Sequence, residues 1–111
     1  MAQEIKLIPM GTAANKPLVC KLTTPELQKR KATVIAELRA LVLERNELDD
    51  GYSYRFDGSD QNLDRLTEFM KTERMCCDFF TFRLIINENI AVLDVCGPPG
   101  AKEFLEMEVG L

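Results

Sequence analysis

The spacing of apolar residues changes period along this chain, and that change limits the folds it can adopt. After Thr24, apolar residues recur at helical spacing to about Glu44, which predicts one long helix with a single buried stripe. Thr24 is a suitable N-cap, and Pro25 suits the first turn of a helix. Residues 52–57 instead alternate between aromatic and polar, which predicts a strand with one buried face. The residues expected to point inward are Tyr52, Tyr54 and Phe56.

The same change of period occurs again in the second half of the chain. Residues 58–60 predict a turn and a cap before a second helix, and residues 79–86 and 90–96 predict two strands joined as a hairpin. A Gly-Pro-Pro-Gly turn precedes a short closing helix, and residues 18–22 predict a short strand ahead of the first helix. The predicted order is β-α-β-α-β-β-α. It indicates an α+β fold in which a mostly antiparallel sheet has its helices packed on one face.

Length and composition predict one domain and narrow the classes of partner. A chain of 111 residues supports a single core, so we expect residues 18–111 to form one α+β domain and residues 1–17 to form an N-terminal arm or an edge strand. The net charge of −4 disfavours a nucleic-acid or anionic-membrane surface, and no apolar run reaches the length of a membrane span. The sheet face without helices could bind a second copy of the chain as a homodimer.

The absence of histidine and the four cysteines restrict the available chemistry. Without histidine, a Ser-His-Asp or Cys-His catalytic arrangement and a histidine metal ligand are excluded. The N-terminus does not resemble a signal peptide, so we expect a cytoplasmic protein whose cysteines are thiols rather than disulfides. The four cysteines are Cys20, Cys76, Cys77 and Cys96.

The end of the second predicted helix carries the residues most able to perform chemistry. Glu73 lies three residues before Cys76 and four before Cys77, which are the separations that bring side chains onto one face of a helix. The two neighbouring cysteines diverge by about 100° on a regular helix, so a site that uses both needs the helix to end there. Arg74 is expected to balance the negative charge.

Thiolates select soft metal ions, and this chemistry makes a metal site the first hypothesis. Cys20 is expected on the inward face of its strand, where it is the natural third ligand to Cys76 and Cys77, with Glu73 as a ligand or as an anchor for one. The ion would be a soft metal such as Zn²⁺ or Cu(I), or a metalloid. Cys96 and Asp94 lie on one face of the predicted strand, and the apolar Leu93 and Val95 lie on the other. Because the apolar face is expected to pack into the core, we expect Cys96 to face away from this site.

Two other interpretations stay open from the sequence, and whether the protein is an enzyme stays open with them. One cysteine could act as a nucleophile or redox thiol that its neighbour resolves, with Glu73 moving protons. Alternatively, the cysteines only fill the core of a structural, dimeric module. The Gly-Pro-Pro-Gly-Ala-Lys segment lacks the pattern of a phosphate-binding loop, so it predicts a strand-to-helix turn and no cofactor.

Four segments resemble a small bacterial family of uncharacterised proteins across residues 18–106. They are Cys20-Lys21-Leu22-Thr23, Leu48-Asp49-Asp50-Gly51-Tyr52, Glu73-Arg74-Met75-Cys76-Cys77, and Gly97-Pro98 followed by Gly100 and Lys102. The resemblance implies that the residues characteristic of the family belong together: Cys20, Glu73, Arg74, Cys76 and Cys77. It implies no activity. The chain departs from the pattern at Asp78, where proline is expected, and at Cys96, where threonine is expected.

Overall fold

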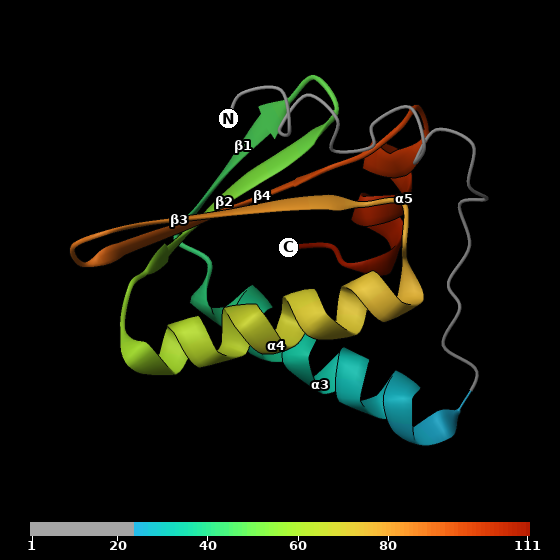
Figure 1. Ribbon diagram of the computed structural model, residues 1–111, viewed down its shortest axis with the longest axis horizontal. Helices are drawn as coiled ribbons and strands as arrows, with labels where there is room; N and C mark the ends of the chain where they lie inside the picture. The colour runs from blue at the N-terminus through green and yellow to red at the C-terminus, as the bar shows by residue number, and fades with distance from the viewer. Residues whose placement is uncertain (1–23) are drawn as a thin grey trace, which may run out of the picture.

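The computed structural model describes residues 24–111, and in this part of the chain helices and strands form an α+β fold, as expected. Three helices and four strands make up the described region (Figure 1). In chain order the elements are α3 (Pro25–Leu41), β1 (Glu44–Leu48), β2 (Gly51–Asp57), α4 (Asp60–Cys76), β3 (Thr81–Asn87), β4 (Ile90–Cys96) and α5 (Ala101–Glu108).

The strands form one antiparallel sheet in the order β1-β2-β4-β3. Strands β1 and β2 form one hairpin, and β3 and β4 form another. The two hairpins join through the central pair β2 and β4, in which Tyr54 lies opposite Leu93. Side chains on one face of this pair are buried, because alternate residues of a strand share a face. The inward positions of Tyr52, Tyr54 and Phe56 are thereby confirmed.

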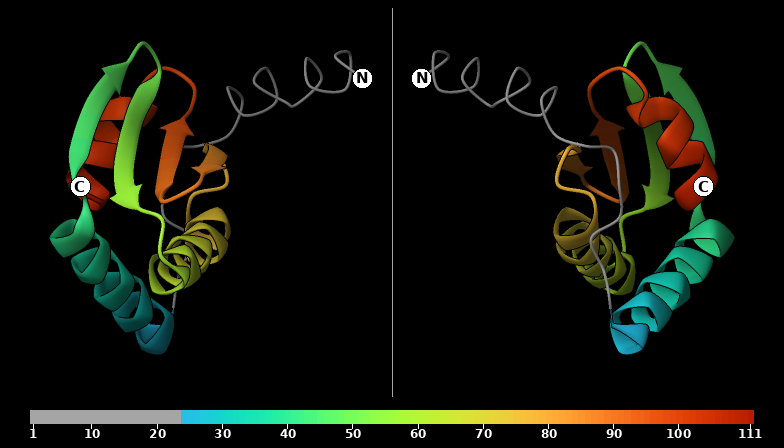
Figure 2. Two further views of the ribbon diagram at one scale, coloured as in Figure 1. Left: turned by 90° about the vertical axis from the view of Figure 1, so that its left-hand side faces the viewer. Right: turned by 90° about the vertical axis from the view of Figure 1, so that its right-hand side faces the viewer.

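The helices cover a single face of the sheet, as the sequence predicts. Side chains of all three helices enter the same buried cluster as the inward faces of β2 and β4. Helices α3 and α4 cross in a V beneath the sheet, and α5 stands at the end away from the tip of the β3–β4 hairpin (Figures 1 and 2). Phe69 of α4 meets Phe82 of β3 edge to face, with 6.2 Å between ring centroids. The Tyr52 hydroxyl of β2 donates to Glu106 of α5, which joins that helix to the sheet.

Both long helices begin at the predicted caps. The Thr24 hydroxyl accepts a hydrogen bond from the Leu27 N–H at 3.3 Å, and the Ser59 hydroxyl accepts one from the Asn62 N–H at 3.2 Å. Each bond satisfies an N–H that has no partner inside its helix. The predicted helix starts are therefore confirmed.

Some element boundaries differ from the sequence prediction, and one strand was not predicted. Helix α3 ends at Leu41 rather than near Glu44, and an unpredicted strand, β1, follows it. Four of the five residues of β1 are exposed, so this edge strand has no buried face that would produce an alternating pattern. Strand β3 begins at Thr81 rather than at residue 79. The predicted strand 18–22 and the arm 1–17 lie outside the described residues.

None of the helices within residues 24–111 is long and apolar enough to cross a membrane.

Candidate functional site

The C-terminal end of α4 brings Glu73, Cys76 and Cys77 together in the interior. Glu73 is 1% exposed and both cysteines are 0% exposed. The helix ends at Cys76, and Cys77 is the C-cap, whose N–H donates to the Glu73 carbonyl at 2.6 Å. Because Cys77 leaves helical geometry, its side chain can turn toward its neighbour, and the two Sγ atoms lie 3.4 Å apart. The condition stated from the sequence, that the helix must end here, is met.

The cysteines of the described region are in different covalent states. Cys76 is disulfide-bonded, and its partner is neither Cys77 nor Cys96, which are both free. The expectation that all four cysteines are thiols is therefore wrong for Cys76. A sulfur with no exposed surface meets an external thiol only when the structure around it opens, since the rate of thiol–disulfide exchange depends on access.

Apolar side chains surround the sulfur atoms of Cys76 and Cys77. Cys76, Cys77, Phe79 and Ala101 form a buried cluster of their own, against which Leu27, Phe80 and Phe104 pack. The Phe79 ring lies 4.6 Å from the Phe80 centroid and 5.1 Å, edge to face, from that of Phe104. The site consequently has a low local dielectric, in which charges interact strongly.

A buried lysine from α3, which the sequence analysis did not single out, completes the site. Lys31 is 8% exposed, and its Nζ lies 3.2 Å from Cys76 Sγ, 3.5 Å from Glu73 Oε2 and 3.6 Å from Glu108 Oε1. The signal that could have revealed it is its spacing, because Lys31 lies four residues after Leu27 and four before Ile35 on the apolar stripe of α3.

Lys31 takes the charge-balancing place that the sequence predicts for Arg74. Arg74 follows Glu73 in α4, but its side chain is exposed and lines a surface groove of about 330 Å³ with Met70, Lys71 and Phe82. Consecutive residues of a helix point about 100° apart, which separates Arg74 from the face that holds Glu73.

Burial controls the protonation of both acidic groups at the site. It raises the pKa of Glu73, and the nearby charge of Lys31 opposes that shift. It also raises the pKa of the Cys77 thiol to about 12, with the negative charge of Glu73 acting in the same direction and Lys31 against it. Cys77 is therefore a thiol rather than a thiolate at neutral pH.

Both carboxylate oxygens of Glu73 are buried, and within the described region no hydrogen bond to them has ordinary geometry, although weaker hydrogen bonding from Lys31 and Cys77 opposes the rise of the Glu73 pKa. Their nearest cation is Lys31, at 3.5 Å. Buried carboxylates almost always accept hydrogen bonds or bind cations, and the Lys31 ammonium is the cation that Glu73 has here.

The predicted metal-ligand set is only partly assembled. Glu73, Cys76 and Cys77 come together, while Cys20 lies outside the described residues. Within residues 24–111, no group of three or more Cys, Asp or Glu side chains is arranged to hold a metal ion. Cys76 is in a disulfide, whereas a ligating cysteine must be a thiolate.

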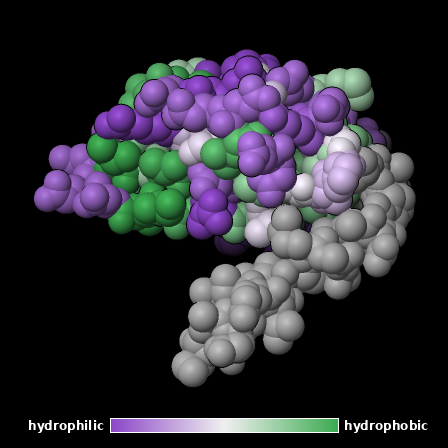
Figure 3. Space-filling view, turned by 90° about the horizontal axis from the view of Figure 1, so that it is seen from above, coloured by the Kyte–Doolittle hydropathy of each residue, from purple (hydrophilic) through white to green (hydrophobic). Residues whose placement is uncertain are grey.

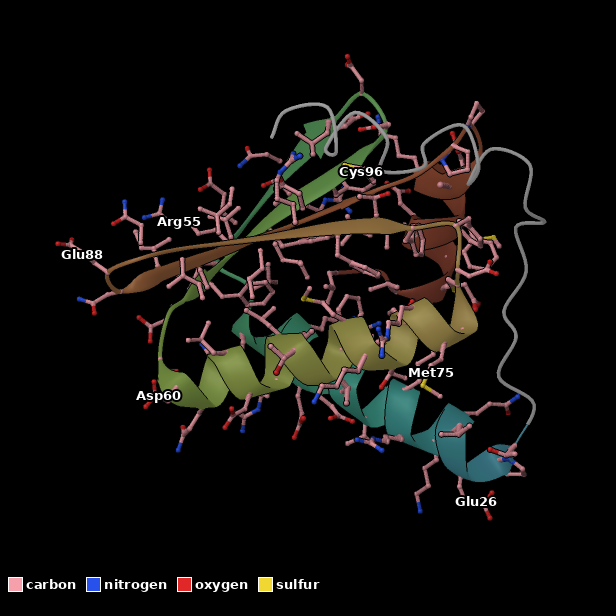
Figure 4. The ribbon with its side chains drawn as sticks, in the orientation of Figure 1. Glu26, Arg55, Asp60, Met75, Glu88 and Cys96 are labelled. Atoms are coloured by element: carbon pink, nitrogen blue, oxygen red, sulfur yellow. The ribbon has the colours of Figure 1, made fainter. Side chains whose placement is uncertain are left out.

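Cys96 belongs to a different place, as its parity predicts. It ends β4 opposite Gly51 and Thr81, and it lines a pocket of about 420 Å³ with Asp50, Arg83 and Asp94. Figure 4 places Cys96 on the side of the sheet away from α3 and α4, whereas Met75, the neighbour of Cys76, lies near the end of α4. Cys96 is therefore a natural control for experiments on the buried pair.

Comparison of the chain with protein-family models, with curated proteins and with solved structures gave no match. The resemblance to a bacterial family accordingly stays a prediction from the residues that carry it.

Proposed function

We propose that the protein is a thiol–disulfide redox protein in which Cys77 resolves the disulfide of Cys76. The observation that carries this proposal is the 3.4 Å separation between a free thiol and a disulfide-bonded sulfur, both sealed from solvent. This separation is within the 3–3.5 Å range of a near-attack arrangement, which also requires the attacking sulfur to line up with the bond that breaks.

The exchange step is internal and balanced. The Cys77 thiol loses its proton to the Glu73 carboxylate, and its sulfur attacks Cys76 Sγ. A Cys76–Cys77 disulfide forms as the bond between Cys76 and its first partner breaks, and that partner leaves as a thiolate that takes up a proton. No electrons are gained or lost in this step.

Small thiols and disulfides complete the cycle. Two molecules of a low-molecular-weight thiol reduce the Cys76–Cys77 bond and leave as one disulfide, and a low-molecular-weight disulfide restores the oxidised form. The Lys31 ammonium, 3.2 Å from Cys76 Sγ, stabilises negative charge on that sulfur when it is reduced. The cytoplasm remains the proposed compartment: disulfides are rare there, and those that form are usually transient and redox-active, which is the role proposed for Cys76.

Disulfide mapping tests this function. The oxidised full-length protein is treated with reduced glutathione, quenched in acid, alkylated and cleaved with trypsin without reduction. The peptide of residues 75–83 contains both Cys76 and Cys77, so an internal disulfide lowers its mass by about two hydrogens relative to the dithiol. We expect this species to appear transiently, and we expect Cys77→Ser to slow the reduction of Cys76 about tenfold or more because the internal attack is lost.

The matched control is Cys96→Ser, which removes the other free thiol of the described region and should leave the rate unchanged. Equal rates of Cys76 reduction in the wild-type and Cys77→Ser proteins would overturn the proposal.

We also propose a homodimer that forms through β3. This strand lies at an edge of the sheet, and its Ile85 and Ile86 are 47% and 53% exposed. Figure 3 shows hydrophobic surface toward its left-hand side, just inward of the hydrophilic tip of the β3–β4 hairpin that Figure 1 places at the left. An apolar edge strand is a template for pairing, and two copies related by a two-fold axis pair antiparallel through the same strand of each subunit.

Light scattering coupled to size exclusion measures this association. Ile85→Lys should convert a dimer to a monomer, because the charge would be buried at the paired edge, while Met107→Lys on exposed α5 should not. A wild-type protein that is monomeric at high micromolar concentration would contradict the dimer.

A further inference from the structure

We propose that the surface groove beside Arg74 receives the tip of the β3–β4 hairpin of a second copy of the chain, with Glu88 of that copy at Lys71 and Arg74. The inference rests on the proposed homodimer and deepens it, because it names the register of the two β3 strands and the surface that each hairpin tip covers. The redox function does not depend on it.

The groove lies between one side of α4 and the start of β3. Its α4 residues recur at the three- and four-residue steps that share one face of a helix, and Phe82 of β3 lines it from the sheet; the α4 residues are Thr67, Met70, Lys71 and Arg74. The groove has a volume of about 330 Å³ and a mostly apolar lining.

Two cations at this groove have no carboxylate beside them. Lys71 and Arg74 are exposed, and neither forms an ion pair within residues 24–111. An apolar floor with two such cations suits an apolar side chain that is accompanied by a carboxylate.

Glu88, at the tip of the β3–β4 hairpin, supplies such a carboxylate. It is exposed and forms no ion pair within the described part of the chain. Its φ of 54° lies in the left-handed region, where glycine or asparagine is favoured, so the geometry of the turn does not account for a glutamate. Figure 4 places Glu88 at the opposite end of the molecule from Met75, the neighbour of Arg74, so Glu88 does not reach the groove of its own chain.

The outer edge of β3 sets how two copies can pair. Asn87 pairs with Ile90 across a two-residue turn, which makes them a hydrogen-bonded pair. The direction of backbone hydrogen bonding alternates along a strand, so the N–H and C=O groups of Phe82, Leu84 and Ile86 point to the outer edge. No strand of the described region pairs on that side. A two-fold axis at Leu84, the middle residue of β3, pairs the whole strand with its copy.

This register brings the hairpin tip of one copy to the groove of the other. Phe82 then lies opposite Ile86 of the second copy, and the two side chains share a face because cross-strand partners do. That face is the one covered by α4, where Phe82 packs against Phe69. Ile86, which is 53% exposed in the single chain, thereby meets the apolar floor of the groove.

Glu88 follows Ile86 by two residues and passes the start of β3 in the other copy, beside the end of α4 that carries Lys71 and Arg74. Opposite charges therefore meet where the apolar contact ends. Because a two-fold axis repeats every contact, each dimer contains this charge pair twice.

Charge reversal tests the contact. Arg74→Glu and Glu88→Arg are prepared in the full-length protein, and the dissociation constant of each dimer is measured by analytical ultracentrifugation, alone and in an equal mixture. Each variant alone should weaken the dimer about tenfold or more, because like charges then face each other at both contacts. Lys29→Glu is the matched control, since it makes the same change of net charge at an exposed position outside the groove and should leave the dissociation constant unchanged.

Mixing the two variants gives the specific result. In a dimer with one copy of each variant, both contacts again join opposite charges, so this mixed dimer should form with a dissociation constant within about threefold of the wild-type value. Native mass spectrometry identifies it, because the two variants differ in mass. Circular dichroism shows whether each variant is folded.

A wild-type dimer whose dissociation constant neither reversal changes would overturn docking in the groove while leaving the pairing of β3 intact. Two weakened variants that do not recover on mixing would also overturn it, because the charges would then not face each other. A monomeric wild-type protein would remove the homodimer and this inference together. None of these outcomes alters the rate at which Cys77 resolves the Cys76 disulfide, so failure here is distinguishable from failure of the redox function.

Discussion

Lys31 is the residue on which the electrostatics of the site depend. Its side chain extends from α3 to the end of α4, where it lies between Cys76, Glu73 and Glu108. A lysine this buried is almost always paired with negative charge, and the buried Glu73 carboxylate likewise needs a cation. Each of the two residues therefore needs the opposite charge of the other, and both lie beside the sulfur pair.

Replacing Lys31 should expose this dependence. We expect Lys31→Met to destabilise the protein by about 3–5 kcal/mol, because it leaves the Glu73 carboxylate buried without its nearest cation. Adding Glu73→Gln to that variant should restore most of the loss, since neither charge is then buried alone.

Urea denaturation of the two single variants and the double variant measures this coupling. Lys29→Met is the matched control, because Lys29 lies on the same helix with its side chain exposed. Additive losses in the double variant would show that Lys31 and Glu73 do not stabilise one another.

At the scale of secondary structure, the site depends on where elements end. Helix α4 stops between its two cysteines, and β4 and α5 are joined by a turn that brings Ala101 against the sulfurs. Gly97 makes this turn possible, because a Cβ there would lie 2.6 Å from the Ala101 Cβ and 3.3 Å from the Phe79 carbonyl oxygen. A tight turn after β4 therefore closes one wall of the site.

Gly97→Ala should disturb that wall. The added methyl group overlaps Ala101, so we expect a loss of about 1–3 kcal/mol in the free energy of unfolding. We also expect faster alkylation of Cys77 in the native variant, because Ala101 packs in the same cluster. Met107→Ala, at an exposed position of α5, is the control.

Thermal denaturation and mass-resolved alkylation check both effects. A Gly97→Ala protein with wild-type stability and wild-type alkylation of Cys77 would show that the turn does not support the site.

For the whole molecule, three helices on one face of a four-stranded sheet concentrate the apolar surface in a single layer. A smaller cluster around the two cysteines lies beside the main core. The disulfide of Cys76 ties the end of α4, and through it this cluster, to another part of the chain. A cross-link of this kind stabilises a fold mainly by restricting the unfolded chain.

Reduction should consequently lower the stability of the whole domain. We expect tris(2-carboxyethyl)phosphine to reduce the free energy of unfolding of the wild-type protein by about 2–4 kcal/mol. The midpoint of thermal unfolding should fall with it, and Cys96→Ser should respond in the same way because Cys96 is free. A Cys76→Ser protein should be insensitive to the reductant, and sensitivity in that variant would contradict the assignment of the disulfide.

Much of the fold was predictable because local signals and burial agree. The caps at Thr24 and Ser59 and the inward face of Tyr52 and Tyr54 follow from side-chain chemistry and periodicity. Strand β1 was not predictable in this way, since its residues Glu44, Arg45 and Asn46 are exposed and its pairing with β2 is made by the backbone. The grouping of Glu73, Cys76 and Cys77 followed from helical spacing, whereas the disulfide state of Cys76 did not.

By itself the sequence determined the α+β class, the single buried face of the sheet, the separation of Cys96 from Cys76 and Cys77, and the convergence of Glu73 with that cysteine pair. Each of these depends on spacing within one element, which the chain carries locally. Only the tertiary structure decided that Lys31 of α3 reaches Cys76 and that Arg74 stays in solvent. Lys31 and Cys76 are 45 residues apart, and contact over such a distance is decided by how helices pack, a property of the whole core rather than of any one segment.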